Sequence, residues 1–199
     1  MEKLDFKKAY KNYYSAKQIP ELHSFGEVNC LTITGKGEPG GKEFQAANEV
    51  LFPMAYGVKK ICKLKGMDFG VPALEGFWWT DNNTSAQDTP RSDWNWKLMI
   101  RMPDYATSEM YQTALAEVLI KKKNPLARNV LFEKIDEGKA AQILHIGAYT
   151  DEQPTIDALY QFIESNGMSL NGLHHEIYLS DPRKTKPADL KTIIRQGVK

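Results

Sequence analysis

Hydrophobic residues along the chain follow two spacings, one typical of strands and one typical of helices. In seven segments apolar residues alternate with polar ones or form short β-branched runs, which predicts β-strands. Three longer segments place apolar residues three or four positions apart, which predicts helices. The predicted strands are 29–37, 71–80, 94–102, 129–135, 140–147, 174–182 and 190–196, and the predicted helices are 42–60, 107–122 and 154–166.

Local signals refine several of these elements. Pro53 lies inside the first predicted helix and should kink or interrupt it. Thr107 precedes the second helix and is a plausible N-cap. The sequence DEGK at 136–139 is a turn signal, so we predict a hairpin that joins strand 129–135 to strand 140–147.

Two parts of the chain share one spacing. A strand ends at Gly35 in one and at Gly147 in the other, and seven residues later a helix begins at Lys42 or at Pro154. Two further predicted strands follow each of these helices. The repeat predicts an α+β protein built from two tandem, pseudo-twofold strand-helix-strand-strand modules, with a central ligand cleft between them.

The repeat also predicts the organisation of the chain. Residues 1–19 have helical spacing and several lysines, and we expect an amphipathic or partly disordered arm that is solvated or packs as an extension. Residues 20–199 should form a single domain. Within it the half-repeats are about 27–102 and 129–197, and helix 107–122 links them.

The strand HHEIYLSDP carries a charge where an apolar residue is usual. His174, Glu176 and Tyr178 share one face of this strand, whereas His175 and Ile177 share the other. Aromatic neighbours disfavour a charged carboxylate unless a cation or hydrogen-bond donors compensate it. Glu176 therefore has three possible uses: neutralising a cationic ligand, orienting a water as general base, or bonding to His174 or a lysine.

Tryptophans cluster in two of the predicted strands. Trp78 and Trp79 point to opposite faces, so one can pack in the core while the other faces a ligand. Trp94 and Trp96 share a face. Such rings fill cores, but they also stack on flat ligands and attract cations, and the residues alone leave both roles open.

Composition narrows the class of protein. The 199 residues include 42% hydrophobic and 26% charged residues, as in an ordinary globular protein, and the net charge is +1. That balance argues against direct nucleic-acid binding. Cys30 and Cys62 are too few for a disulfide scaffold, and there is no signal-like or membrane-spanning run. We expect a cytoplasmic protein without membrane contact, and the sequence leaves open whether it is a monomer or a dimer.

Several common kinds of chemistry find no support in the motifs. GKGEPG at 35–40 matches GxGxxG, but Pro39 removes a backbone donor and no parallel βαβ pattern follows, so we interpret it as a turn. His174 and His175 point to opposite faces, and there is no HExxH pattern. There is also no GxSxG motif for a serine nucleophile. We therefore expect no metal and no cofactor.

Longer phrases give a family resemblance over about residues 20–197. LTITGKGEPGGKEFQAA, ALEGFWW, WKLMIRMPDY, EKIDEGKAAQILHIGAYTDEQPTI and HHEIYLSDPRKTKPADLKTIIRQ resemble the GyrI-like small-molecule-binding proteins, in the branch without a DNA-binding domain. The resemblance implies a tandem pair of strand-helix-strand-strand modules with a ligand cleft. It also implies binding of flat aromatic molecules, which can be cationic. Some stand-alone members hydrolyse cyclopropanoid genotoxins, whereas others are multidrug sensors or act on protein partners as the gyrase inhibitor does.

The resemblance also assigns site residues. Glu176 matches the acidic residue of the family pocket and would be the catalytic residue if the protein is a hydrolase. The loop 81–93 is long and polar, and it could cover the ligand or stand apart from it. Trp78, Tyr178 and Tyr149 match positions that line the cleft, with His145, Trp96 and Tyr111 as secondary candidates.

Overall fold

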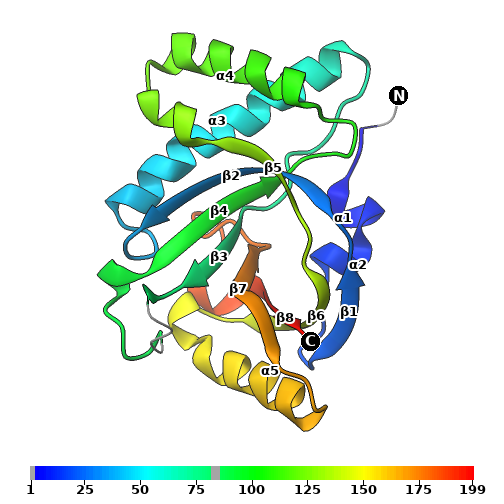
Figure 1. Ribbon diagram of the computed structural model, residues 1–199, viewed down its shortest axis with the longest axis vertical. Helices are drawn as coiled ribbons and strands as arrows, with labels where there is room; N and C mark the ends of the chain where they lie inside the picture. Colours follow the sequence, from blue (N-terminus) through cyan, green and yellow to red (C-terminus); the bar gives the residue numbers. More distant parts are fainter. Residues whose placement is uncertain (1–2, 82–85) are drawn as a thin grey trace. The chain divides into compact units, whose positions relative to one another are not determined.

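The computed structural model describes residues 3–81 and 86–199 and separates into two compact units (Figure 1). Unit 1 consists of the described residues of Met1–Phe6, Val28–Pro72 and Trp78–Ile135. Unit 2 consists of Lys7–Glu27, Ala73–Phe77 and Asp136–Lys199. Residues 82–85 of the loop 81–93, which could cover the ligand or stand apart from it, lie outside the described part of the chain.

Unit 1 is a three-stranded antiparallel sheet in the order β4-β2-β5, with helices α3 and α4 packed together beside it (Figure 1). The last two residues of β3 also belong to this unit. Its elements are β2 (Val28–Lys36), α3 (Lys42–Leu64), η2 (Arg91–Asp93), β4 (Asn95–Arg101), α4 (Ser108–Lys122), η3 (Pro125–Asn129) and β5 (Leu131–Ile135).

Unit 2 places its strands in the order β1-β6-β8-β7-β3 and packs α5 against β6 and β8. The β1–β6, β6–β8 and β7–β8 pairs are antiparallel. Its elements are α1 (Phe6–Ala9), α2 (Lys11–Tyr14), β1 (Glu21–Phe25), β3 (Glu75–Trp79), β6 (Gly138–Ile146), η4 (Tyr149–Asp151), α5 (Gln153–Ser165), β7 (Leu170–Tyr178), η5 (Pro187–Asp189) and β8 (Lys191–Val198).

The α+β class and the order strand-helix-strand-strand are confirmed. The order occurs as β2-α3-β3-β4 and again as β6-α5-β7-β8. All ten predicted strands and helices are present, with boundaries that shift by a few residues. The exact limits of the half-repeats remain a prediction.

The helices form where the apolar spacing and the capping residues agree. Along α3 the residues at helical spacing are buried, among them Val50, Met54 and Val58, and the helix continues through Pro53 without interruption. In α4 the Thr107 hydroxyl accepts a hydrogen bond from the backbone N–H of Met110, as an N-cap does. The predicted cap is therefore confirmed, and the predicted interruption at Pro53 is wrong.

The predicted hairpin at 136–139 is also wrong. Strand β5 pairs with β2 in unit 1, whereas β6 pairs with β1 and β8 in unit 2. The carboxylate of Asp136 accepts a hydrogen bond from the backbone N–H of Gly138, so a tight local turn does form. Pairing partners are decided by the sheets rather than by the turn residues, and here the turn marks the boundary between the units.

The core of unit 2 lies between α5 and the sheet. Leu159 and Ile163 of α5 pack on apolar residues of β6 and β8, and their side chains are fully buried or nearly so. The sheet residues of this cluster are Ala141, Ile143, Ile194 and Val198.

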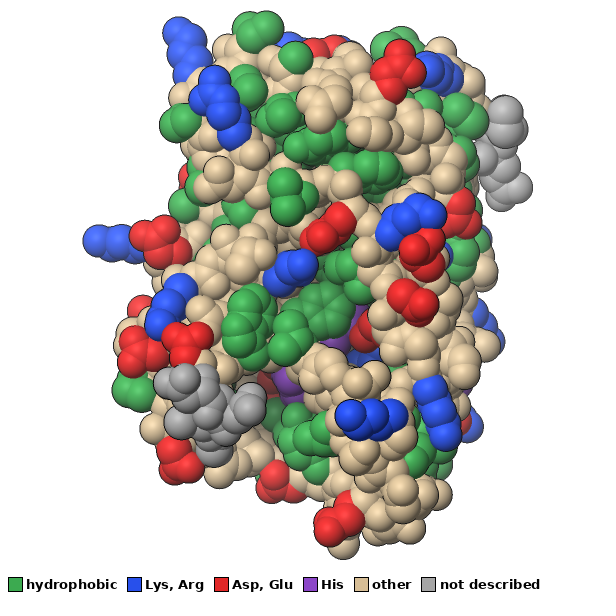
Figure 2. All heavy atoms as spheres, in the orientation of Figure 1, with side chains coloured by type: hydrophobic (Ala, Val, Ile, Leu, Met, Phe, Trp, Pro, Cys, Tyr) green, Lys and Arg blue, Asp and Glu red, His purple; other side chains and the backbone are tan. Residues whose placement is uncertain are grey.

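The N-terminal arm is a packed part of the molecule. Tyr13 and Tyr14 on α2 are buried in unit 2, and the Tyr13 ring lies against Phe25 of β1. Of the two expectations for residues 1–19, these contacts support the packed extension. In the described residues no helix combines the length and apolar character needed to cross a membrane. On the face drawn in Figure 2, acidic and basic side chains are interspersed.

Candidate functional site

Strand β7 carries the candidate site on the face that is turned toward α5. A bulge between Leu170 and His174, with Gly172 at a φ of 77°, sets the register from which the strand continues. Glu176 then lies opposite Ile194, a member of the α5 core. Directly opposite residues point to the same side of a sheet, so Glu176 faces α5. The predicted alternation is confirmed, because His175 and Ile177 are fully buried on the other face.

The Glu176 carboxylate is held by two neighbours from its own strand. Its Oε1 lies 3.1 Å from Nε2 of His174, and its Oε2 accepts a 2.8 Å hydrogen bond from the Tyr178 hydroxyl. The side chain is only 14% exposed. Within residues 3–81 and 86–199, no lysine or arginine forms an ion pair with it. The carboxylate therefore has two donors and, among the described residues, no lysine or arginine partner.

Tyr149, on η4, adds a second aromatic wall beside Tyr178. The two rings meet edge to face, with centroids 5.7 Å apart and an angle of 80°. The Tyr149 hydroxyl forms no hydrogen bond to any other described residue. Burial raises the pKa of Tyr149 to about 12, and the carboxylates of Glu152 and Glu176 add to the shift. The hydroxyl therefore stays protonated and is available as a donor. The structure brings Glu176, Tyr178 and Tyr149 together.

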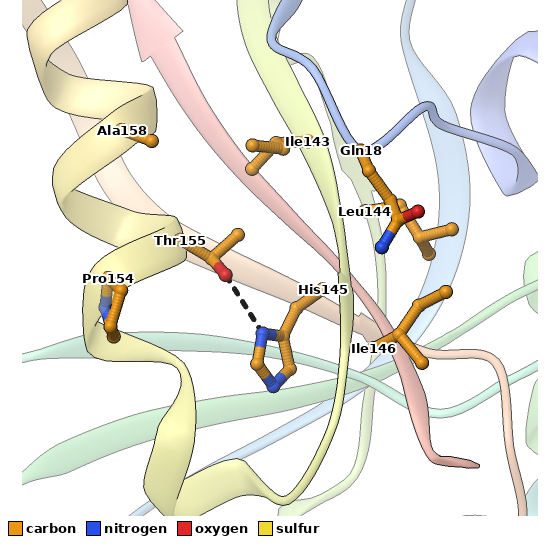
Figure 3. A pocket seen from close by; sticks show the side chains of 8 residues that line it. All are labelled: Gln18, Ile143, Leu144, His145, Ile146, Pro154, Thr155 and Ala158. Carbon is orange, nitrogen blue, oxygen red and sulfur yellow. Dashed lines mark hydrogen bonds between the residues drawn. The ribbon is translucent and has the colours of Figure 1, made fainter. Parts of the chain in front are cut away.

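His145 lies on β6 and Tyr178 lies on β7. Both residues pair with Thr192 of β8, so one strand separates them. The Nδ1 of His145 is 2.9 Å from the Thr155 hydroxyl on α5 (Figure 3). Its Nε2 is 3.2 Å from the Ala148 carbonyl oxygen. Both ring nitrogens are therefore committed. His145 lines an open pocket of about 270 Å³ with Gln18, Ile143, Leu144, Ile146, Pro154, Thr155 and Ala158 (Figure 3).

Trp78 and Trp96 belong to an aromatic cluster in unit 1. The Trp78 ring stacks on Phe44 of α3 at 5.9 Å and meets Trp94 edge to face at 6.0 Å. Trp96 is 2% exposed and contacts the edge of Phe44, with Gly35 directly against its ring. These contacts give both tryptophans a packing role.

Tyr111, on α4, is fixed by the structure of unit 1. Its hydroxyl donates a 2.6 Å hydrogen bond to the carbonyl oxygen of Val130, and its ring stacks on Phe132. Burial raises the pKa of this phenol. Tyr111 therefore lies in a separate packing environment from Trp78 and Trp96.

Sequence reasoning missed a buried charged cluster on the other face of β7. His175 Nδ1 lies 2.8 Å from Glu137 Oε1, and Arg195 Nη1 lies 2.7 Å from Glu137 Oε2. His175 Nε2 is 3.1 Å from Glu75 Oε2, an ion pair whose atoms are not aligned as a hydrogen bond. Glu75 also accepts a 2.7 Å hydrogen bond from the hydroxyl of Tyr13. All these side chains lie within unit 2.

One signal could have found part of this cluster. Glu75 interrupts the apolar strand ALEGFWW just as Glu176 interrupts its own strand, and a carboxylate in such a place needs a partner. Nothing in the sequence marks Glu137, which lies in a turn. Cys30 and Cys62 are buried free thiols. In the described ranges no group of three or more His, Cys, Asp or Glu residues is placed to hold a metal ion.

Comparison with known proteins gives close structural relatives. A conserved protein of Listeria innocua is 38% identical, with a TM-score of 0.92 over 99% of this chain and 100% of its own. A hydrolase of Listeria innocua is 37% identical, with a TM-score of 0.87 over the same shares. The EcmrR C-terminal domain is 17% identical, covers 90% of this chain and 96% of its own, and shares the fold with a TM-score of 0.58. Among curated proteins none matches the chain.

A family comparison agrees with the fold and includes strand β7. The profile of the GyrI-like small molecule binding domain matches residues 42–198, from the start of α3 to the end of β8. The chain belongs to the GyrI-like small molecule binding domain family.

Proposed function

We propose that this protein binds flat aromatic molecules that carry a positive charge, with Glu176 as the charge partner. The observation that carries the proposal is a nearly buried carboxylate that has two hydrogen-bond donors and no lysine or arginine partner in the described ranges. A carboxylate removed from water needs a compensating charge, and a cationic ligand supplies one. The rings of Tyr178 and Tyr149 offer the aromatic faces that attract such a cation.

The other residues predicted to contact the ligand have no established role, and their contacts with it stay predictions. Trp78, in unit 1, is buried, and its ring stacks on Phe44 and meets Trp94 edge to face. The extensive packing of Trp96 and Tyr111 favours a supporting role for them. Direct contact with nucleic acid or a membrane has no part in the proposed function.

A matched pair of probes tests the binding site. N-methylacridinium carries a fixed positive charge, whereas acridine at alkaline pH is a neutral ring system of nearly the same shape. We expect Glu176→Gln to weaken N-methylacridinium binding by about tenfold, which corresponds to about 1.4 kcal/mol, and to leave acridine binding nearly unchanged. Quenching of tryptophan fluorescence or calorimetry would measure both. Equal loss for the two probes, or no loss for either, would contradict a charge-partner role.

A second candidate function is hydrolysis of a strained ring in a bound aromatic molecule. The Listeria protein described as a hydrolase supports it, because it is 37% identical over nearly the whole chain. The substrate class would be a cyclopropane fused to a conjugated dienone. Water adds to a cyclopropane carbon, the ring C–C bond breaks, and its electron pair moves through the conjugated system to the carbonyl oxygen. The product is a phenol that carries a new hydroxyl group.

Two residues of the site have the chemistry that this reaction needs. The Glu176 carboxylate would accept a proton from the attacking water. The uncommitted hydroxyl of Tyr149 would donate to the carbonyl oxygen while negative charge develops there. Solvent exchanges the proton on Glu176 and restores the one on Tyr149. Relief of ring strain lowers the barrier, so a single base and good orientation suffice.

Product analysis distinguishes the two functions. With a cyclopropanoid substrate, the wild type should form the hydrated phenol, and Glu176→Gln should be slower by about a hundredfold or more. Equal rates would exclude Glu176 as the base. Binding of the substrate without product on long incubation would leave the binding function alone.

A further inference from the structure

We propose that His174 is a positioning residue, which holds the Glu176 carboxylate in place for the ligand, and that Tyr160 supports the imidazole from α5. The inference rests on the proposed function of Glu176 and adds two residues to that site. Tyr160 lies on α5 and His174 lies on β7, so the arrangement joins the helix to the strand that carries the carboxylate.

The two oxygens of Glu176 are restrained separately. His174 lies two residues before Glu176 on the same face of β7, and its Nε2 is 3.1 Å from Oε1. Tyr178 lies two residues after it and donates to Oε2 at 2.8 Å. Rotation of the carboxylate would break both contacts at once. Each oxygen keeps a second acceptor site for a ligand or a water, because a carboxylate can accept about four hydrogen bonds.

The Glu176 carboxylate determines which nitrogen of His174 carries the proton, because a carboxylate only accepts hydrogen bonds. A neutral imidazole has one donor and one acceptor nitrogen. With the N–H on Nε2 and pointing at Glu176, Nδ1 is left as the acceptor. The Tyr160 hydroxyl, at a long 3.5 Å from Nδ1, is placed to donate to it. The hydrogen bond made by one imidazole nitrogen commonly sets the role of the other in this way.

Strand β8 offers Glu176 no substitute donor. Directly opposite Glu176 on β8 is Ile194, which has no polar side-chain atom. Opposite His174 is Gln196, whose amide donates to backbone oxygens of Asn171, Gly172 and Gly197. The hydrogen bond from His174 is therefore the one that holds Oε1 among the described residues.

His175 shows what a structural histidine looks like on the same strand. It is fully buried between Glu75 and Glu137, and Arg195 balances part of their charge. His174 and Glu176 are instead 16% and 14% exposed, and within the described ranges no arginine or lysine joins them. A largely buried but still accessible pair without an arginine or lysine is suited to receive a charged ligand.

The test compares two replacements of His174 in the full-length chain. His174→Gln keeps an N–H donor near the position of Nε2, whereas His174→Leu keeps the bulk and removes the donor. Loss of the donor should free Oε1 and weaken the orientation of the carboxylate. We expect His174→Leu to weaken N-methylacridinium binding by about tenfold, with acridine changed by less than about twofold. His174→Gln should recover most of that loss, and Tyr160→Phe should show a smaller loss of the same kind.

A double-mutant cycle separates this role from a merely structural one. In the Glu176→Gln background, His174→Leu should cause no further loss of N-methylacridinium binding, because the residue acts through Glu176. If Glu176→Gln weakens binding but His174→Leu does not, or if the two losses add, the positioning role is overturned and the proposed function stands. If Glu176→Gln itself binds the cation as the wild type does, the proposed function fails and the positioning role with it.

Discussion

The imidazole of His175 and the carboxylate of Glu137 lie 2.8 Å apart in a cluster that is almost fully removed from water. Burial alone would raise the pKa of Glu137, yet His175 and Arg195 together lower it to about 2. Burial alone would also lower the pKa of His175, but the carboxylates of Glu137 and Glu75 outweigh it and raise that pKa. Each group therefore favours the charged form of the other.

The first prediction concerns Glu137 and acid. A depressed carboxyl pKa contributes stability that is complete above the unfolded value of 4.5 and is lost as pH falls toward about 2. Glu137→Gln should lower the free energy of unfolding by about 3–5 kcal/mol near neutral pH, because it leaves Arg195 and His175 buried without this partner. Urea unfolding at a series of pH values measures it. Glu164→Gln, at an exposed position on α5, is the control and should change little. A constant difference between wild type and Glu137→Gln down to strongly acid pH would contradict the coupling.

The second prediction concerns the stability that His175 contributes to this cluster as the pH rises. The raised pKa of His175 means that its contribution is complete below the unfolded value of 6.5 and is lost as pH rises through the folded value. His175→Gln should therefore be less stable than the wild type at mildly acid pH, and the gap should narrow as pH increases. Thermal unfolding across neutral and alkaline pH would show the convergence. A gap that widens with pH would mean that His175 is neutral in the folded protein.

The third prediction concerns the hydrogen bond from the arm to Glu75. The Tyr13 hydroxyl donates to Glu75 Oε2 at 2.7 Å, and the Tyr13 ring also lies against the Arg195 guanidinium. Tyr13→Phe keeps the ring and removes only the hydroxyl, so the loss should be about 1.5–3 kcal/mol, as for a hydrogen bond to a charged group. Tyr56→Phe removes a hydroxyl from an exposed tyrosine on α3 and is the matched control. Equal unfolding midpoints for the two variants would count against the anchoring role of the arm.

Helix and strand positions could be predicted well because they depend on spacing within a few residues. The face of β7 followed from alternation alone, which is why Glu176, Tyr178 and His174 were expected to lie together. The cap at Thr107 was equally local. These properties need no knowledge of which strand pairs with which.

Long-range pairing could not be predicted in the same way. The turn at 136–139 looked like a hairpin, but β5 and β6 find different partners because sheet pairing is decided by the cross-strand packing of whole strands. The cluster around His175 draws on β3, β7, β8, the N-terminal arm and the turn before β6, so no short stretch of sequence contains it. Tyr160 was likewise assigned no role, since its contact with His174 depends on how α5 lies on the sheet.

The fourth prediction concerns the aromatic cluster of unit 1. A Cβ atom at Gly35 would lie 2.2 Å from the Trp96 ring, which is fixed against Phe44. Gly35→Ala should therefore destabilise the protein by about 1–3 kcal/mol through overpacking. Gly26→Ala is the matched control, because a Cβ there meets no atom within 4 Å. Near-ultraviolet circular dichroism should report the displaced tryptophan in the first variant only. A Gly35→Ala protein with unchanged stability and spectrum would show that Trp96 can move freely.

The last prediction separates two tyrosines that differ in what their hydroxyls do. Tyr178 donates to Glu176, whereas the Tyr149 hydroxyl has no hydrogen-bond partner among the described residues and its pKa is raised to about 12. If the protein opens a strained ring, Tyr149→Phe removes the donor to the carbonyl oxygen. The turnover number should then fall by about a hundredfold while the KM changes little, as for loss of a single oxyanion donor.

Tyr178→Phe should behave differently, because it frees one oxygen of the base rather than removing a donor to the substrate. We expect it to weaken the binding of cationic ligands as well as to slow turnover. Because the pKa of Tyr149 lies near 12, the wild-type rate should show no decline from ionisation of this phenol until strongly alkaline pH. Steady-state kinetics of both variants with one cyclopropanoid substrate decides the matter. Should Tyr149→Phe keep the wild-type turnover number while Tyr178→Phe loses it, the two roles must be exchanged, with Tyr178 as the donor to the substrate.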